Sequence, residues 1–213
     1  MPGNVRDITI DLIRHGEPVG GRRYRGHGID DPLSETGWAQ MWEAIGEAAP
    51  WDRIVSSPLR RCRAFAEALA SRHGTPVTLE PGFREVGFGC WEGRRPAEIQ
   101  ANNRAEYEAF YADPVNRRPP GAEPLDSFIT RVVTAYTAVL RNPGGQHCLI
   151  VAHAGVIRAI IAHVLQASPV SLYRIKVDNA GVTRIRHGRY GGKLEFHNVA
   201  LPRRAAEPPK ILC

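Results

Sequence analysis

Five side chains suited to chemistry on an anion each follow a short run of apolar residues. They are Arg14, His15, Arg61, Glu85 and His153. The runs before them are typical of strands, and the carboxyl ends of parallel strands meet at one edge of an α/β sheet. We therefore expect two imidazoles, two guanidinium groups and one carboxylate to converge at that edge. Such a set suits phosphoryl transfer, in which positive charge stabilises the transferred group and a carboxylic acid moves a proton.

Each of these residues also has an ordinary structural explanation when it is taken alone. A histidine after a strand usually makes a structural hydrogen bond, and Arg14 alone would fit a surface ion pair. Arg61 stands beside Arg60 and Arg63, so any of the three could lie on a solvated helix face. Glu85 could cap a turn. The occurrence of the whole set at successive strand ends favours the functional interpretation.

Strands and helices alternate in a pattern that would position these residues. Runs of β-branched and apolar residues predict strands over residues 5–13, 51–56, 77–79 and 149–152. Helical spacing of apolar residues predicts helices over residues 34–45, 57–69, 125–140 and 156–164. Ser34 is expected to cap the first helix, and Ser57 with Pro58 is expected to begin the second. Short alternating runs over 171–199 predict antiparallel edge strands. The fold class is therefore α/β, a three-layer sandwich with a mostly parallel central sheet flanked by helices.

The chain length suits one domain. The 213 residues are expected to form a single domain over 1–201. The polar segment 96–120, which is helix-like over 97–111, is interpreted as an excursion over the active site. Residues 202–213 are rich in proline and charge and are predicted to be a disordered tail.

Composition points to a cytoplasmic protein that binds a small anion. The net charge is +6, but the arginines are scattered rather than arranged in a stripe, which disfavours nucleic acid as a partner. No apolar run is long enough to cross a membrane, and no secretory leader precedes the first strand. The four cysteines are far apart and form no C-x-x-C pair, so we expect them to be reduced.

Successive blocks of the sequence resemble the signature of the histidine phosphatase superfamily, also called phosphoglycerate mutase-like. The blocks are L-I-R-H-G-E (12–17), D-P-L-S-E-T-G (31–37), S-S-P-L-R-R (56–61), R-E-V-G-F-G-C-W-E-G (84–93), P-G-A-E (120–123) and V-A-H-A-G-V-I-R (151–158). They cover roughly residues 8–165 in the family's order. The stretch R-Y-R-G-H-G-I-D-D-P-L-S (23–34) resembles the α-ribazole phosphatase branch or its broad-specificity relatives.

The resemblance implies a phosphomonoesterase that works through a phosphohistidine on His15, with Glu85 protonating the departing oxygen. It also implies that Arg14, Arg61 and His153 line the phosphate pocket. In the family motif the pocket arginine is the second after S-S-P-L, so Arg61 is preferred to its neighbour.

Two departures from the family pattern concern contacts to the phosphate. Ala154 stands where many members have glycine, so its contact with phosphate is expected to differ. An asparagine that is common after R-H-G-E is missing, and two glycines occupy that region. Arg22, Arg23 and Arg25 are candidates to replace it, and Arg25 is included in the predicted phosphate site.

Other functions were weighed against this one. A metal hydrolase is disfavoured because His15, His27 and His153 show no close ligand spacing, so no metal and no cofactor are expected. A phosphoglycerate mutase would be the enzymatic alternative, although this chain is short of the insertions usual in mutases. A pseudoenzyme that binds a phosphorylated ligand is the non-enzymatic alternative. The expected partner is a small phosphorylated metabolite, with neither nucleic acid nor membrane, and a homodimer is left open.

Overall fold

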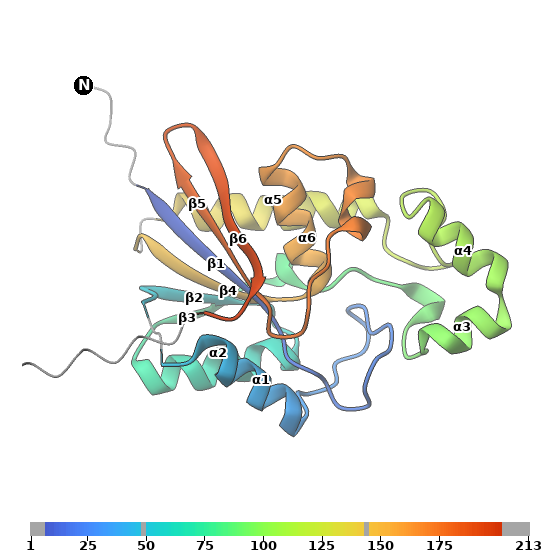
Figure 1. Cartoon of the computed structure of the whole chain (residues 1–213), viewed down its shortest axis with the longest axis horizontal. Coiled ribbons are helices and arrows are strands. Elements are labelled where there is room, and N and C mark those ends of the chain that lie inside the picture. Colours follow the sequence, from blue (N-terminus) through green and yellow to red (C-terminus); the bar gives the residue numbers. More distant parts are fainter. Residues whose placement is uncertain (1–6, 48–49, 143–144, 202–213) are drawn as a thin grey trace, which may run out of the picture.

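A six-stranded mixed sheet separates two layers of helices in the computed structural model, which describes residues 7–47, 50–142 and 145–201 (Figure 1). The strand order is β3-β2-β4-β1-β5-β6; the first four strands run parallel to one another, β5 runs antiparallel to β1, and β6 runs antiparallel to β5. The strands are β1 (Ile8–Arg14), β2 (Arg53–Ser56), β3 (Val77–Leu79), β4 (His147–Ala152), β5 (Val182–Gly188) and β6 (Gly191–Val199). The predicted α/β sandwich with a mostly parallel sheet is confirmed, and so are the antiparallel strands at its edge.

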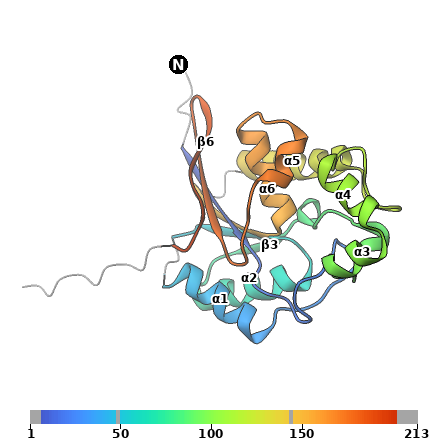
Figure 2. The same cartoon turned by 45° about the vertical axis from the view of Figure 1, so that its right-hand side comes forward.

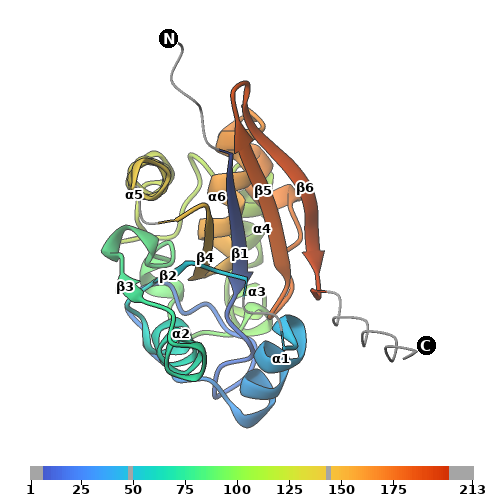
Figure 3. The same cartoon turned by 90° about the vertical axis from the view of Figure 1, so that its left-hand side faces the viewer.

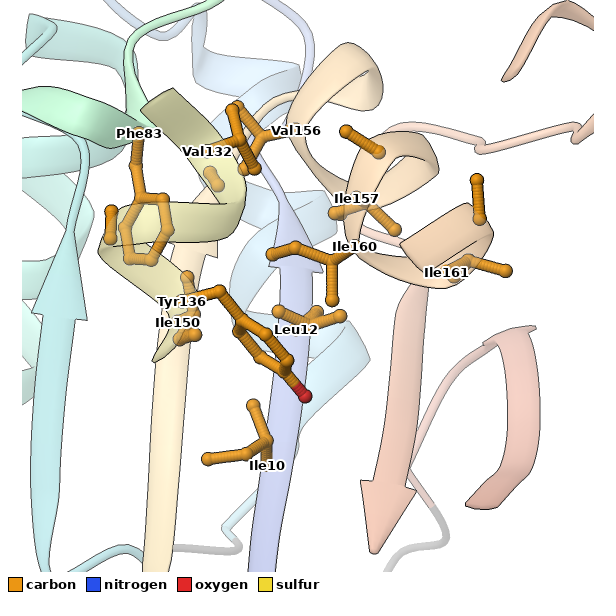
Figure 4. Close-up of a cluster of buried hydrophobic side chains, with 14 of the residues drawn as sticks. Ile10, Leu12, Phe83, Val132, Tyr136, Ile150, Val156, Ile157, Ile160 and Ile161 are labelled. Atoms are coloured by element: carbon orange, nitrogen blue, oxygen red, sulfur yellow. The ribbon is translucent and has the colours of Figure 1, made fainter. Parts of the chain in front are cut away.

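Alternate residues of the strands bury two separate apolar clusters. Ile10 and Leu12 of β1 lie in the cluster that packs against α5 and α6, part of which is drawn in Figure 4. Ile13 points the other way, into the cluster formed with α1 and α2. Figures 2 and 3 show these two pairs of helices on opposite sides of the sheet. The helices are α1 (Glu35–Ile45), α2 (Arg60–His73), α5 (Leu125–Arg141) and α6 (Ala154–Val164).

Two strands begin later than the sequence predicts. β1 begins at Ile8, and residues 1–6 lie outside the described part of the chain. β2 begins at Arg53 rather than at residue 51. Trp51 turns inward instead, where its indole N–H donates to the buried carboxylate of Asp11 at 2.8 Å. This hydrogen bond satisfies a polar group that would otherwise be buried without a partner.

The helices next to the strand ends begin in different ways. Ser34 caps α1 as predicted, because its hydroxyl accepts the N–H of Gly37 at 3.0 Å. The prediction that Ser57 caps α2 is wrong, because the helix begins at Arg60 after an extended residue and has no side-chain cap. The Ser57 hydroxyl lies 2.8 Å from His153 instead. Ser57 therefore contacts the site as well as the turn before the helix, where its hydroxyl accepts the N–H of Leu59 at 3.3 Å.

The polar excursion forms two helices, α3 (Pro96–Asn102) and α4 (Arg104–Ala112), rather than one. The break lies at Asn103, whose side chain accepts the N–H of Glu106 and so caps α4. Both helices lie beyond the carboxyl ends of the parallel strands (Figure 1). A cluster of aromatic side chains joins them to the loops there, namely Tyr24, Phe88, Trp91, Tyr107 and Phe110.

Three short 3₁₀ helices complete the described structure. They are η1 (Pro81–Phe83), η2 (Gly89–Trp91) and η3 (Pro169–Arg174). The predicted tail over 202–213 lies outside the described residues. No helix within the described ranges is long and apolar enough to span a membrane.

Candidate active site

The register of the central strands brings the two predicted histidines together. Arg14 at the end of β1 pairs with Ala152 at the end of β4, so the next residue of each strand meets its counterpart. The backbone N–H of His15 donates to Ala152 O at 3.0 Å, and the rings of His15 and His153 lie 5.1 Å apart between centroids. Two histidines far apart in the sequence thus lie together at the carboxyl ends of neighbouring parallel strands, as the sequence predicts.

The environment of His15 favours a neutral imidazole with one free nitrogen. Its Nδ1 lies 2.8 Å from Gly16 O, and a carbonyl only accepts, so Nδ1 carries the proton. The Nε2 lone pair is left free to attack. Burial lowers the pKa of His15 well below its usual value, and the charges of Arg61 and Arg14 lower it further. His15 is therefore uncharged at neutral pH, as a nucleophilic imidazole must be.

The guanidinium groups of the buried Arg61 and the half-buried Arg14 lie near this histidine. Arg61 donates from its two Nη atoms to Ile29 O and Gly26 O, each at 2.8 Å, and Arg14 donates to Val177 O at 2.6 Å. The Nε atoms of both arginines are buried without a partner. Burial lowers the pKa of Arg14 to about 10, so its charge persists at neutral pH. Unpaired buried donors with positive charge form a ready site for an anion.

Arg60 differs from its neighbour, as the family motif implies. Its side chain is exposed, and only its backbone N–H makes a described contact, 2.7 Å from Asp30 Oδ1. Arg61 is 1% exposed and points inward. The preference for Arg61 as the pocket arginine therefore agrees with the direction of the two side chains.

His153 is fully buried and is held by two residues that sequence reasoning missed. Ser57 Oγ lies 2.8 Å from its Nε2, and Cys62 Sγ lies 3.5 Å from the same atom. Burial lowers the pKa of His153 well below its usual value, with Arg61 the next contribution. Ser57 and Cys62 follow β2, beside the end of β4, so only the strand pairing places them here.

Glu85 lies in the loop after η1, and its position is fixed from both sides. Its carboxylate accepts the N–H of Val86 at 2.9 Å and the N–H of Gly155 at 3.3 Å. Its backbone carbonyl accepts from Arg131, which also pairs with Glu123 at 2.7 Å. Arg131 bonds two further carbonyls of the same loop, so it acts as a brace. Glu123, the last residue of the P-G-A-E block, takes part in this brace. Nothing in the sequence distinguishes Arg131 from the other arginines.

Ala154 and Gly155 begin α6 at the base of the site. Ala154 is the first residue of the helix, and no hydrogen bond or ion pair from it to another site residue is described. The contact made here comes from Gly155, whose N–H points at Glu85. A Cβ on Gly155 would lie 2.2 Å from Glu85 Oε1, so a larger residue would displace the carboxylate. The predicted role of Ala154 in phosphate binding stays a prediction.

Arg25 is buried in the loop between β1 and α1 and braces that loop. Its Nε pairs with Asp31 Oδ2 at 2.8 Å, and its Nη2 donates to Val19 O and Gly21 O. It still lies near enough to contribute to the lowered pKa of His15. Arg23 folds back onto Gly20 O and Arg22 is exposed, so Arg25 is the candidate closest to the site among the three.

Glu92 ties the same loop to the turn before η2. Its two carboxylate oxygens accept the N–H groups of Gly28 at 3.0 Å and Phe88 at 2.9 Å. Gly26 approaches so closely that a Cβ there would meet Glu92, and its φ of +54° also favours glycine. The W-E-G part of the 84–93 block is therefore structural. Glu92 holds the loop whose Gly26 carbonyl accepts from Arg61.

Comparisons with known proteins agree with this geometry. Residues 10–200 match the family model described as histidine phosphatase superfamily, branch 1. The adenosylcobalamin/α-ribazole phosphatase of Salmonella typhimurium is 31% identical over 176 residues, covering 80% of this chain and 86% of that protein. The α-ribazole phosphatase structure from Shigella flexneri superposes with a TM-score of 0.79 at 25% identity, covering 94% of this chain and 100% of that one.

A mycobacterial glucosyl-3-phosphoglycerate phosphatase is similar to the same extent. Its structure has a TM-score of 0.79 at 27% identity, and the alignment covers 91% of this chain and 100% of that chain. Structures of relatives with different substrates in their names thus share one fold with this chain. The chain belongs to branch 1 of the histidine phosphatase superfamily.

Proposed function

We propose that this protein is a phosphomonoesterase that hydrolyses a small phosphorylated metabolite through a phosphohistidine on His15. One observation carries the proposal: a neutral His15 lies near Arg14 and Arg61, whose buried Nε–H groups have no partner among the described residues. A neutral nucleophile is not repelled by the dianion of a phosphate monoester. The arginine donors match the oxygens of the transferred group.

In the first step His15 Nε2 forms a bond to phosphorus as the ester P–O bond breaks. The electron pair of that bond leaves with the alcohol oxygen, which takes a proton from the carboxylic acid of Glu85. Positive charge from Arg14 and Arg61 stabilises the transferred phosphoryl group. His153 lies beside it as a hydrogen-bonding group held by Ser57.

The second step returns the enzyme to its starting form. Glu85, now a carboxylate, accepts a proton from a water molecule whose oxygen attacks phosphorus. The P–N bond to His15 breaks, inorganic phosphate leaves, and Glu85 is protonated again. Each turnover therefore consumes one ester and one water and releases one alcohol and one phosphate.

Metal independence is part of the proposal, because two arginines and two histidines supply the groups that a cation would otherwise provide. Within the described residues no group of three or more His, Cys, Asp or Glu side chains is arranged to hold a metal ion. Hydrolysis of p-nitrophenyl phosphate should survive excess EDTA. Loss of activity that Zn²⁺ or Mg²⁺ restores would contradict this part.

The relatives suggest the starting set of substrates. α-Ribazole phosphate comes from the similarity to proteins that carry that name, and glucosyl-3-phosphoglycerate comes from the name of the mycobacterial relative. We propose that residues 1–201 act as one catalytic domain, with the excursion over 96–120 covering the bound substrate. A mutase or an inactive binding protein would differ from a phosphatase in the fate of the phosphoryl group.

The decisive experiment follows that phosphoryl group. Rapid quench after mixing with ³²P-labelled phosphomonoester should give acid-labile, alkali-stable label on His15, followed by inorganic phosphate. His15→Asn should abolish the label, whereas His73→Asn, an exposed histidine at the end of α2, should keep it. Label that moves to a second position of the substrate would indicate a mutase. Binding without any label or product would indicate an inactive binding protein.

A further inference from the structure

A small cavity lies directly beside Glu85. It has a volume of about 30 Å³. Its wall includes Glu85, Gly155, Arg158 and Tyr173 together with the rings of Phe88 and Phe128. A space of this size admits one small polar group. With the leaving oxygen at Glu85, as the proposed function requires, the neighbouring atoms of the alcohol lie within reach of this cavity.

Arg158 brings an unpaired positive charge to the cavity wall. It is half-buried on α6, and its Nε donates to Ile175 O at 2.8 Å, which anchors the guanidinium group. Among the described residues, no acceptor bonds its two Nη atoms and no carboxylate lies within ion-pair distance of it. A partly buried cation without a partner is costly, so an anionic group of a ligand would be stabilised there.

Tyr173 adds a second free donor on the same wall. Its oxygen lies 3.1 Å from Nη1 of Arg118, which can only donate, so the tyrosine oxygen accepts there and its own proton remains available. Arg118 is fixed in turn by a hydrogen bond to Gly87 O at 3.0 Å and by the ring of Phe88. The cavity therefore presents hydrogen-bond donors from Arg158 and Tyr173 to whatever enters it.

We propose that Arg158 and Tyr173 form a leaving-group subsite that selects phosphomonoesters whose alcohol carries a carboxylate. This inference rests on the proposed function, because Glu85 marks the leaving oxygen only if it is the acid. The planar guanidinium fork matches a carboxylate with two parallel hydrogen bonds. Glu85 is neutral in the form that donates its proton, so it does not repel the bound carboxylate. α-Ribazole phosphate has no carboxylate and would leave these donors unused.

The test compares 3-phosphoglycerate with glycerol 3-phosphate, which differ only by a carboxylate in place of a hydroxymethyl group. Wild-type protein should prefer 3-phosphoglycerate in kcat/KM by about 10- to 100-fold, the range expected for a charge-assisted contact. Arg158→Met should bring the ratio close to one. Tyr173→Phe should lower it by less. Arg174→Met, which removes an exposed arginine of η3, is the matched control and should keep the wild-type ratio.

A second measurement uses the wild-type protein alone, in case Arg158→Met does not fold. Glycerate, the product that carries the carboxylate, should inhibit competitively at a concentration about ten-fold lower than glycerol does. A wild-type ratio near one, or a ratio that Arg158→Met leaves unchanged, would overturn the inference. In those cases labelling of His15 and hydrolysis of p-nitrophenyl phosphate would persist, so the proposed function would stand. Absence of both would instead overturn the proposed function.

Discussion

At the scale of single residues, Arg61 has two tasks that its neighbour does not share. Its buried Nε has no hydrogen-bond partner among the described residues and is the donor we propose for the phosphate, and its two Nη atoms hold the loop before α1 through Ile29 O and Gly26 O. Both tasks need a planar fork with several donors, which a lysine cannot reproduce. A change of Arg61 to lysine should therefore impair both tasks, whereas an arginine-to-lysine change at an exposed position should have little effect.

Substitution of the two adjacent arginines tests this difference. Arg61→Met should lower kcat by about 10²- to 10³-fold, the usual loss when a donor to the transition-state charge is removed. It should also lower the free energy of unfolding by about 1 to 3 kcal/mol, because two buried carbonyls lose their partner. Arg60→Met should change neither by much, since its side chain is exposed. Steady-state kinetics with urea unfolding would show both effects, and the reverse ranking would contradict the assignment.

Glu85 should matter in proportion to the basicity of the leaving group. Alkyl phosphates expel a strongly basic alkoxide, whereas p-nitrophenyl phosphate expels a phenolate that departs without help. Glu85→Gln should therefore slow single-turnover transfer from the alkyl ester far more than from p-nitrophenyl phosphate. General acid assistance is worth about 10²- to 10⁴-fold, which sets the size of the contrast. Equal losses on both esters would remove Glu85 as the acid.

At the scale of elements, the site depends on a loop that is held from several directions. Arg25 and Asp31 pair within the loop before α1, and Glu92 bonds it to the turn before η2 through Gly28 and Phe88. The backbone there follows no regular element, so side chains supply the hydrogen bonds that a sheet or helix would otherwise provide. The order of this loop therefore depends on these side-chain hydrogen bonds.

Removal of one of these bonds should loosen the loop without touching the chemistry directly. Glu92→Gln keeps the shape of the side chain, but its amide nitrogen cannot accept a backbone N–H. Amides of residues 24–31 should then exchange hydrogen roughly 10-fold faster or more, because a lost charge-assisted bond costs about 1.5 to 3 kcal/mol. Mass spectrometry of the exchanged peptides would measure this, with the exposed Glu43→Gln on α1 as the control. Unchanged exchange would mean that Glu92 does not hold the loop.

The sequence predicts those parts of the site that obey local rules. His15 and His153 end apolar runs, and the carboxyl ends of parallel strands share one edge, so their meeting follows from the run pattern. The contacts of Ser57 and Cys62 with His153 do not follow from it, because they need the register between β2 and β4. Ser57-Pro58 also has the composition of a helix start, and tertiary contact with His153 overrides that local preference.

The same limit explains the excursion and the braces. The helical spacing over 97–111 predicts one helix, and it does not reveal that Asn103 caps a second one. Arg131 and Arg158 are two arginines among many in a basic chain, and only the folded structure separates a brace from an unpaired charge. The type and order of the elements could thus be predicted, whereas the partners of individual polar groups could not.

At the scale of the whole molecule, the buried histidines connect stability to pH. In the unfolded chain both His15 and His153 have a pKa near 6.5, and burial lowers both values in the folded protein. The unfolded state then binds more protons at acidic pH, so stability is complete above about pH 6.5 and falls as the pH drops below it. The site is therefore a source of acid sensitivity even in the absence of substrate.

Urea unfolding at several pH values would measure this link. The free energy of unfolding should decrease below pH 6.5 with a slope of up to about 1.4 kcal/mol per pH unit for each histidine. His153→Asn should reduce that slope by up to about 1.4 kcal/mol per pH unit, the contribution of one histidine. Denaturation curves between pH 5 and 7.5 suffice. The same slope in the variant would show that His153 takes up its proton in the folded state.

The attachment of α3 and α4 through an aromatic cluster has a consequence for how this protein can diversify. His15, Arg14 and His153 lie at strand ends and Arg61 lies in the first turn of α2, whereas these two helices are joined to the rest through the Tyr24, Phe88 and Trp91 rings. If the segment covers the bound substrate, as we propose, its insertion or exchange during evolution would change which alcohols are admitted, in addition to the selection by Arg158 and Tyr173, and would leave the carboxyl ends of the strands unchanged. Transplantation of residues 96–120 between relatives should accordingly transfer substrate preference more readily than any exchange of strands.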